Sequence, residues 1–425
     1  MIERVFNRLS IAGLCATLIG NGIGRFAFIA LMPALIQAGW FTQADASYLG
    51  VATLVGYMLG AALSDSLAAR FSSAMLLRAS MLACSLSFLA CAIADAPLAW
   101  YYAWRTAAGV CGAILMVLPA PVVLARHEVS IRARTSGVVF SGIGLGAAVS
   151  GVLVPLLIAG VGLSFPVGEA GVPLFRLQGV TGAWLGLGTV CLGLTAWSWR
   201  SWPDEEKSVA LTTERAELPS DIKLRVALIV VAHGLNAVGY LAHTMFLPDY
   251  VVRELGMPLS TAGFFWSMFG LGAAIGPMLT GTLADRFGLK RCLIAGFMLK
   301  AVSAVLPVLS SNSAVLVVSA CLMGICTPGI VALVSAYTLD CVGQAHHRKA
   351  WGLATSSFAI AQATGGALMA FAATRLDSYH ALFCVSGAAL VGSVICVALI
   401  SERSSSEEPS SDSDPSFVVA PSPNP

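Results

Sequence analysis

Apolar stretches of about 20 residues follow one another along almost the whole chain, with short polar segments between them. A stretch of this length is what an α-helix needs to cross a bilayer. Only 11% of the residues are charged and 57% are hydrophobic, so the chain needs lipid as its solvent. We therefore expect an all-α polytopic membrane protein. The predicted spans are 9–35, 44–64, 74–94, 98–122, 135–160, 178–199, 224–248, 259–283, 291–310, 313–338, 350–374 and 378–400.

The basic residues between these spans indicate an orientation. If both termini are cytoplasmic, most of the 24 Lys and Arg residues lie on the cytoplasmic side, and only Arg176, Arg253 and Arg375 lie outside. This bias is the positive-inside rule, and an odd number of helices would spoil it. We expect a multi-pass protein of the inner (plasma) membrane with cytoplasmic termini. The net charge of +2, scattered over loops, gives no indication of nucleic-acid binding.

The longest polar interruption, 202–225, falls midway along the hydrophobic part of the chain. Aligning Asp65 with Asp285 also brings Gly146-Ala147 onto Gly366-Ala367, which is a weak internal repeat. Parallel repeats of this kind predict two related six-helix bundles with the solute site at their interface. The predicted organisation is an N-terminal bundle (1–200), a cytoplasmic linker (201–223), a C-terminal bundle (224–400) and a disordered tail (401–425).

A polar loop with a distinctive pattern, Gly-Thr-Leu-Ala-Asp-Arg-Phe-Gly-Leu-Lys-Arg at 281–291, lies between the eighth and ninth spans. It resembles the loop signature of the major facilitator superfamily. We expect Gly281 to allow close helix contact and Asp285 to accept charge-assisted hydrogen bonds, forming a latch in one access state only. A degraded copy lies in the first half. The candidate latch residues are Asp65, Arg70, Gly281, Asp285, Arg286, Gly288, Lys290 and Arg291.

Three further segments resemble this family. Arg105-x-x-x-Gly109 is similar to its intramembrane arginine motif, and residues 21–28 resemble the opening of the bacterial YbfB-like branch. The fifth span is similar to the glycine-rich antiporter motif, without its adjacent Gly-Pro, through Gly137, Gly142, Gly144, Gly146, Gly151 and Pro155. The resemblance covers the chain except its tail. It implies a twelve-helix fold in which helices 1, 4, 7 and 10 line a central cavity.

Three basic residues and no central acidic residue lie deep within the predicted spans, namely Arg25, Arg105 and Lys300. A charge there costs about 2.5–3.5 kcal/mol and needs a partner, a watery cavity or a function. Asn21 and Tyr101 lie one turn before the two arginines. An arginine fork suits carboxylate or phosphate, although bonding to helix-end carbonyls is the structural alternative. Helix 9 is peripheral in the family, so we expect Lys300 to snorkel or to brace a neighbour.

The seventh span carries His233, Asn236, Tyr240 and His243 at spacings of 3, 4 and 3, which place them on one helical face. We expect this stripe to line the cavity or the seam between halves. Either histidine would suit a coupling proton, and a packing role is the alternative. The candidate substrate-binding residues are Asn21, Arg25, Tyr101, Arg105, His233, Asn236, Tyr240, His243 and Gln362.

These features predict a secondary active transporter that moves a small solute, preferably an organic anion, by alternating access coupled to protons or exchange. No catalytic constellation, metal-ligand spacing or P-loop is present, so we expect no enzyme, metal or cofactor. We expect a functional monomer. One alternative is an efflux antiporter for amphipathic drugs or cations, with a wall of Phe264, Phe265, Trp266 and Tyr240. Another is a membrane sensor that binds without transport.

Overall fold

The structure is a computed structural model that describes residues 5–128, 131–162, 176–177, 179–203 and 219–400. Within these residues, 12 helices are long and apolar enough to cross a membrane. They are Arg8–Gln37, Gln43–Arg70, Ser73–Ala90, Leu98–Leu124, Arg134–Ala159, Gly179–Ser201, Ile222–Glu254, Leu259–Phe287, Leu289–Leu309, Ser313–Gln344, His346–Ala373 and His380–Ala398. Each predicted span overlaps one of them, which confirms the fold class. The central part of the predicted linker, 204–218, and the tail lie outside the described residues.

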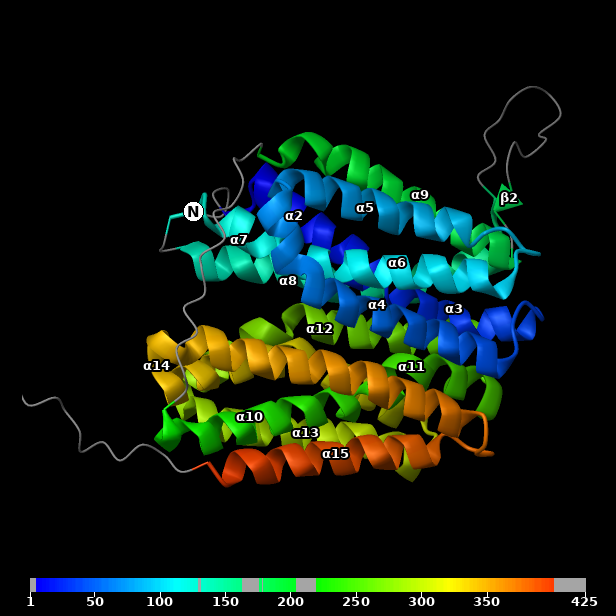
Figure 1. The fold of residues 1–425 in the computed structure, drawn as a ribbon. Coiled ribbons are helices and arrows are strands. Elements are labelled where there is room, and N and C mark those ends of the chain that lie inside the picture. Colours follow the sequence, from blue (N-terminus) through cyan, green and yellow to red (C-terminus); the bar gives the residue numbers. More distant parts are fainter. Residues whose placement is uncertain (1–4, 129–130, 163–175, 178, 204–218, 401–425) are drawn as a thin grey trace, which may run out of the picture.

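The first bundle occupies the upper half of Figure 1. Its first span is divided into α2 (Arg8–Thr17), the π-helix η1 (Leu18–Ile23) and α3 (Phe26–Gln37). The other elements are α4 (Gln43–Arg70), α5 (Ser73–Ala90), α6 (Leu98–Val117), α7 (Pro119–Leu124), α8 (Arg132–Ala159), the antiparallel pair β1 (Val161–Gly162) and β2 (Arg176–Leu177), α9 (Gly179–Ser198) and the 3₁₀ turn η3 (Trp199–Ser201).

The second bundle lies below the first in Figure 1. Its first span is also divided, into α10 (Ser220–Gly239), α11 (Leu241–Asp249) and the π-helix η4 (Tyr250–Glu254). The rest are α12 (Leu259–Phe287), α13 (Leu289–Leu309), α14 (Ser313–Ala373) and α15 (His380–Ala398). Two spans are joined in α14 at Gly343, which has φ +72°, a conformation that glycine adopts without steric cost. Because η4 ends at Glu254, the seventh span runs past its predicted end at 248.

The two ends of the bundle are named here by what they carry. The described chain begins just before α2 and ends just after α15, and both of these points lie at the terminus end, on the left of Figure 1. Arg8 and Ile400 belong to this end. Gln43, at the start of the second span, and His380, at the start of the last, lie at the distal end.

Local sequence signals mark where several of these helices begin. Thr42 caps α4 in a capping box with Asp45, because each side chain bonds the other residue's backbone N–H.

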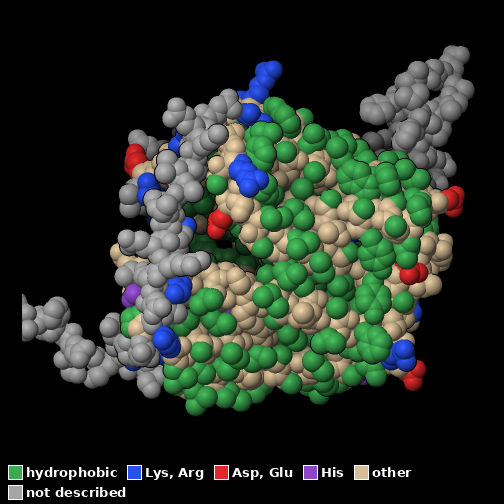
Figure 2. Space-filling model, in the orientation of Figure 1, with side chains coloured by type: hydrophobic (Ala, Val, Ile, Leu, Met, Phe, Trp, Pro, Cys, Tyr) green, Lys and Arg blue, Asp and Glu red, His purple; other side chains and the backbone are tan. Residues whose placement is uncertain are grey.

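The outer surface is apolar over the middle of the bundle. Figure 2 shows hydrophobic side chains covering most of this face, with the charged side chains gathered mainly towards the two ends. Large apolar residues well inside their spans, such as Met278, Ile275 and Val302, are 80%, 56% and 51% exposed. An exposed apolar belt of this size is untenable in water and fits the hydrocarbon core of a membrane.

Glycines bring the two bundles into direct contact along α8 and α12. Gly144 and Gly151 of α8 face Gly270 and Gly263 of α12 so closely that a methyl group at any of them would overlap the opposing backbone. Ser267 Oγ also donates a hydrogen bond across the seam to the carbonyl of Ala148, at 3.0 Å. Small residues permit this approach between membrane helices. Part of the glycine series in the fifth span therefore forms the seam between the halves.

Candidate functional site

Arg25 lies midway along the first span, at the seam, and is bonded by residues of the other bundle. Its Nη2 donates to the hydroxyl of Tyr240 at 2.9 Å. With its amide oriented to satisfy all three side chains, Gln362 accepts through Oε1 from Arg25 Nη1 at 3.0 Å and Nη2 at 2.7 Å, and from the Tyr240 hydroxyl. The guanidinium carbon also lies 5.2 Å from the Phe26 ring centroid. The structure thus brings together three predicted site residues from helices 1, 7 and 11.

Among the described residues, Arg25 has only neutral hydrogen-bond partners, and no Asp or Glu forms an ion pair with it. Its side chain is half-buried, whereas Tyr240 and Gln362 are fully buried. A guanidinium without a counter-ion at membrane depth is costly, and an incoming anion would offset that cost. The geometry suits a carboxylate or phosphate, which the planar fork of arginine binds through two donors.

The break in the first span positions Arg25. The chain leaves regular α geometry over η1, and Arg25 has φ −100° and ψ −52° before α3 begins. Gly20 and Gly22 let this segment pack closely against α6 and α8. Asn21 does not reach the seam, because its Nδ2 donates to the carbonyl of Gly112 in α6 at 3.0 Å. Asn21 therefore ties the broken helix to its own bundle.

Arg105 braces the same break from α6. Its Nη2 donates to the carbonyl of Gly24 at 2.9 Å, and the side chain is 1% exposed. Its guanidinium carbon lies 4.9 Å from the Phe28 ring centroid, and Nε and Nη1 have no partner among the described residues. This is the structural arrangement that the sequence left open. Tyr101, one turn away, donates to the carbonyls of Ile93 and Ala94 at the distal end.

The polar stripe of the seventh span crosses a helix break and is not a single face. α10 ends at Gly239, and Tyr240 caps it before α11 begins. His243 Nε2 lies 2.8 Å from Ser319 Oγ, inside the second bundle. The His233 ring packs against Phe358, with centroids 4.8 Å apart. All four stripe residues are buried, and Tyr240 alone of them is bonded to the other bundle among the described residues.

Lys300 also belongs to this region, although the sequence favoured a peripheral role. Its Nζ donates to Asn236 Oδ1 at 2.8 Å and lies 5.0 Å from the ring centroid of Tyr240. The side chain is fully buried, so the expectation that it snorkels is wrong, while bracing a neighbour fits. The only signal in the sequence for the buried position of Lys300 was the cost of placing a charge inside the membrane.

The seam is closed at the distal end by Gln43, Asp249, Arg253 and Tyr379, which we call the distal seal. Gln43, from the first bundle, donates through Nε2 to the carbonyl of Ala373 at 3.0 Å and to the hydroxyl of Tyr379 at 2.9 Å. Its Oε1 accepts from Arg253 Nη2 at 3.1 Å. These bonds attach the start of α4 to the distal ends of three elements in the second bundle.

Asp249 anchors the distal seal from within. Its Oδ2 accepts from Tyr379 and, at 3.2 Å, from Arg253 Nη1, and its side chain is fully buried. The predicted seventh span ended at residue 248. No acidic residue was therefore expected at depth, and Asp249 was missed. Burial and the neighbouring Asp249 carboxylate raise the pKa of Tyr379, which lies between the last two spans. Tyr379 therefore remains a hydrogen-bond donor.

The predicted latch is not formed at the terminus end. Asp65 and Asp285 are exposed and have no hydrogen bond or ion pair with another described residue. Nothing approaches a methyl group built at Gly281, so this residue makes no close helix contact in the state described here. Gly288 instead provides a turn with φ +87° between α12 and α13, and Lys290 Nζ bonds the carbonyl of Ile400 at 2.7 Å. Arg70, Arg286 and Arg291 are exposed beside these residues.

The bundles part at this same end, where Figure 2 shows a hollow between them.

The sequence model of the family described as "Uncharacterised MFS-type transporter YbfB" matches residues 17–399. The chain belongs to this family of MFS-type transporters. The resemblance seen in residues 21–28 and in the 281–291 loop is thereby confirmed, and secondary transport is the general activity of this family and fold.

This MFS-type transporter is also similar to individual proteins. A segment of 64 residues is 38% identical to an uncharacterized MFS-type transporter, YfiU, of Bacillus subtilis (strain 168), and covers 15% of this chain and 12% of that protein. Over 92% of this chain, the fold matches crystal structures of a mutant of the nucleoside transporter NupG and of a D-xylose-proton symporter. Both have a TM-score of 0.70, with identities of 10% and 14% and coverage of 99% and 96% of those chains. At these identities the likeness establishes the fold.

Proposed function

We propose that this MFS-type transporter moves a small organic anion, which binds between the bundles at Arg25. The supporting observation is a half-buried guanidinium at mid-depth whose hydrogen-bond partners, Tyr240 and Gln362, are both neutral. An anion would supply the missing charge, whereas a cation would be repelled by Arg25 and by Lys300, which also lies near the ring of Tyr240. Phe26, packed edge-on against Trp266 and Phe269 at 5.7 Å, would bound the site with apolar surface.

The proposed transport cycle follows from the state of the two ends. The distal seal is formed and the latch residues at the terminus end are apart, so the site would be reached from the terminus end. The opposite state requires the bonds of Gln43 to break and the segments around Asp65 and Asp285 to approach the facing bundle. Each set of contacts stabilises one access state, and that is the requirement for alternating access.

The direction of access depends on the proposed orientation. We infer that both termini lie in the cytoplasm of a cell whose inner membrane holds the protein, because the basic residues gather at the terminus end. The state described here would then face the cytoplasm. Coupling would come from protons or from exchange with a second anion. One structural neighbour is a proton symporter, which supports the proton alternative only at the level of the fold.

An anion-binding test separates this proposal from its alternatives. Purified wild-type protein and Arg25→Gln are heated with benzoate, succinate, inorganic phosphate and tetraphenylphosphonium, and the unfolding temperature is recorded. We expect one or more anions to stabilise the wild type and the matched control Arg375→Gln, an exposed arginine at the distal end, but not Arg25→Gln. Stabilisation by the cation alone would support drug or cation efflux, and equal anion stabilisation of all three proteins would overturn the role of Arg25. Flux in vesicles then separates a transporter from a sensor.

A further inference from the structure

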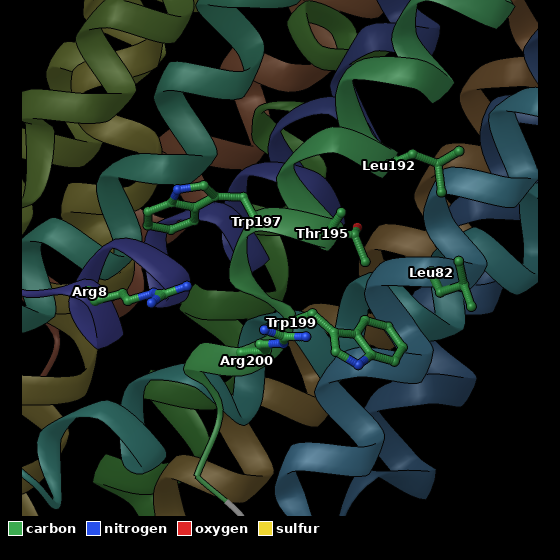
Figure 3. Close-up of a pocket in the computed structure, with 8 residues that line it drawn as sticks. Arg8, Leu82, Leu192, Thr195, Trp197, Trp199 and Arg200 are labelled. Atoms are coloured by element: carbon green, nitrogen blue, oxygen red, sulfur yellow. The ribbon is translucent and has the colours of Figure 1, made fainter.

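A second concave site lies on the outer face of the first bundle, at the terminus end and away from the seam (Figure 3). It has a volume of about 620 Å³ and lies between α2, α5 and α9. Its described lining residues are Arg8, Leu82, Leu192, Thr195, Ala196, Trp197, Trp199 and Arg200. We call this the interfacial groove. It lies at the depth where a membrane surface would meet the helix ends, and transport through the seam makes no use of it.

The rim of the interfacial groove is positively charged. Arg8 and Arg200 are both exposed, and neither has a hydrogen bond or ion pair with another described residue. The guanidinium carbon of Arg8 lies 6.0 Å from the ring centroid of Trp197. No acidic side chain is among the described lining residues. Two cations with no anionic neighbour in the part of the chain that the structure describes leave a place for a ligand that carries negative charge.

The turn that carries one side of the rim is held in place. Arg78 of α5 donates through Nε to the carbonyl of Trp199 at 2.9 Å and through Nη2 to that of Trp202 at 3.0 Å. Its guanidinium carbon also lies 6.0 Å from the Trp199 ring centroid. These contacts fix the η3 turn, which presents Trp199 and Arg200 together. The backbone position of this side of the rim is therefore fixed by the fold.

The groove changes character along its length. Trp197 and Trp199, at the charged rim, are 46% and 40% exposed, as tryptophans are at the interface between lipid and water. Leu82 and Leu192 line the part nearer the middle of the spans. A ligand that fits would have a negatively charged head and apolar chains, and would enter from the membrane. We propose that the interfacial groove binds one anionic phospholipid, with its phosphodiester between Arg8 and Arg200 and its chains beside the two leucines.

The test uses the full chain in detergent and measures the lipids that remain bound, by native mass spectrometry. Wild type and the double variant Arg8→Gln/Arg200→Gln are titrated with dioleoylphosphatidylglycerol and with dioleoylphosphatidylcholine. We expect the wild type to prefer the anionic lipid, and the double variant to bind it roughly tenfold more weakly. The charge-matched control is Lys223→Gln/Arg348→Gln, two exposed cations at the terminus end of the second bundle, which should bind as the wild type does.

Two further arms distinguish a lipid from free phosphate. Leu192→Trp keeps both arginines and fills the apolar part of the groove, so it should weaken phosphatidylglycerol without removing charge. Inorganic phosphate at equal concentration should not displace the bound lipid. The proposal is overturned if both double variants bind phosphatidylglycerol equally, if phosphatidylcholine binds as well as phosphatidylglycerol to the wild type, or if inorganic phosphate competes fully. Each outcome is independent of whether the protein transports an anion.

Discussion

Arg25 and Lys300 come from different bundles and both approach the side chain of Tyr240. Arg25 Nη2 lies 2.9 Å from its hydroxyl, and Lys300 Nζ lies 5.0 Å from its ring centroid. An anion that takes the guanidinium of Arg25 would therefore release Tyr240 and change the surroundings of a second intramembrane charge. This contact connects the proposed substrate site with the interior of the second bundle.

Replacing Asn236 with alanine should expose the dependence of Lys300 on its partner. Asn236 Oδ1 is the hydrogen-bond acceptor of Lys300 among the described residues, and the lysine is fully buried. We expect Asn236→Ala to cost about 2–3 kcal/mol, because a buried polar group loses its partner. Lys300→Met in the same chain should recover much of that loss. Denaturation of the four proteins of this double-mutant cycle is the measurement, and purely additive effects would contradict the pairing.

Removing the side chain of Gln43 should open the distal end. Gln43→Ala deletes three hydrogen bonds across the seam, one of them to the charged Arg253. A bond of that kind contributes about 1.5–3 kcal/mol, enough to move a two-state population by tenfold or more. Nitroxide labels at Gln37 and Thr374, both exposed at the distal end, should report longer distances by electron spin resonance.

This measurement needs a clean background and a control. The exposed Cys384 is first replaced by serine so that it does not take a label. Glu254→Gln changes a nearby carboxylate that bonds Ser378 and the backbone of Tyr379, all within the second bundle. It should leave the label distances nearer to those of the parent. A Gln43→Ala protein with an unaltered distance distribution would show that the distal seal does not hold this end closed.

Adding a methyl group at the glycine seam should be costly only where the helices touch. A Cβ at Gly144 would meet the backbone of α12, whereas one at Gly137, on the same helix, meets open space. We expect Gly144→Ala to destabilise the protein by about 1–3 kcal/mol through overpacking. Gly137→Ala should be neutral or slightly stabilising. Unfolding temperatures of the two variants in mild detergent test this, and equal effects would contradict the seam.

The distal seal should weaken in alkaline solution. The pKa of Tyr379 is raised in the folded protein by burial and by Asp249, so its contribution to stability is complete below the ordinary phenol pKa of about 10 and is lost as pH rises further. The free energy of unfolding of the wild type should therefore exceed that of Tyr379→Phe by a constant amount from about pH 8 to about pH 10, and by a shrinking amount above that. An advantage that stays level or grows above this range would argue against the raised pKa.

Several features of this protein were predictable because they depend on local composition. The length and apolar content of each segment determine whether it crosses a membrane, so the twelve spans followed from composition. The same reasoning located Arg25, Arg105 and Lys300, since a charge among apolar neighbours is visible in a sequence. The spacing of polar residues along the seventh span placed Tyr240 among the candidate binding residues, and Gln362 was another of them. The family followed from the resemblance of short motifs, such as the 281–291 loop, to those of known transporters.

The partners of those charges depended on how the helices break and pack. The break at Gly239 and Tyr240 separates the polar stripe, so Tyr240 meets Arg25 while His243 turns to Ser319. Extension of the seventh span buries Asp249 in the distal seal. A sequence gives the spacing of side chains along one helix, but a hydrogen bond between helices depends on their crossing and rotation to within about an ångström. Those are set by packing across the whole bundle, which is why only the tertiary structure decided them.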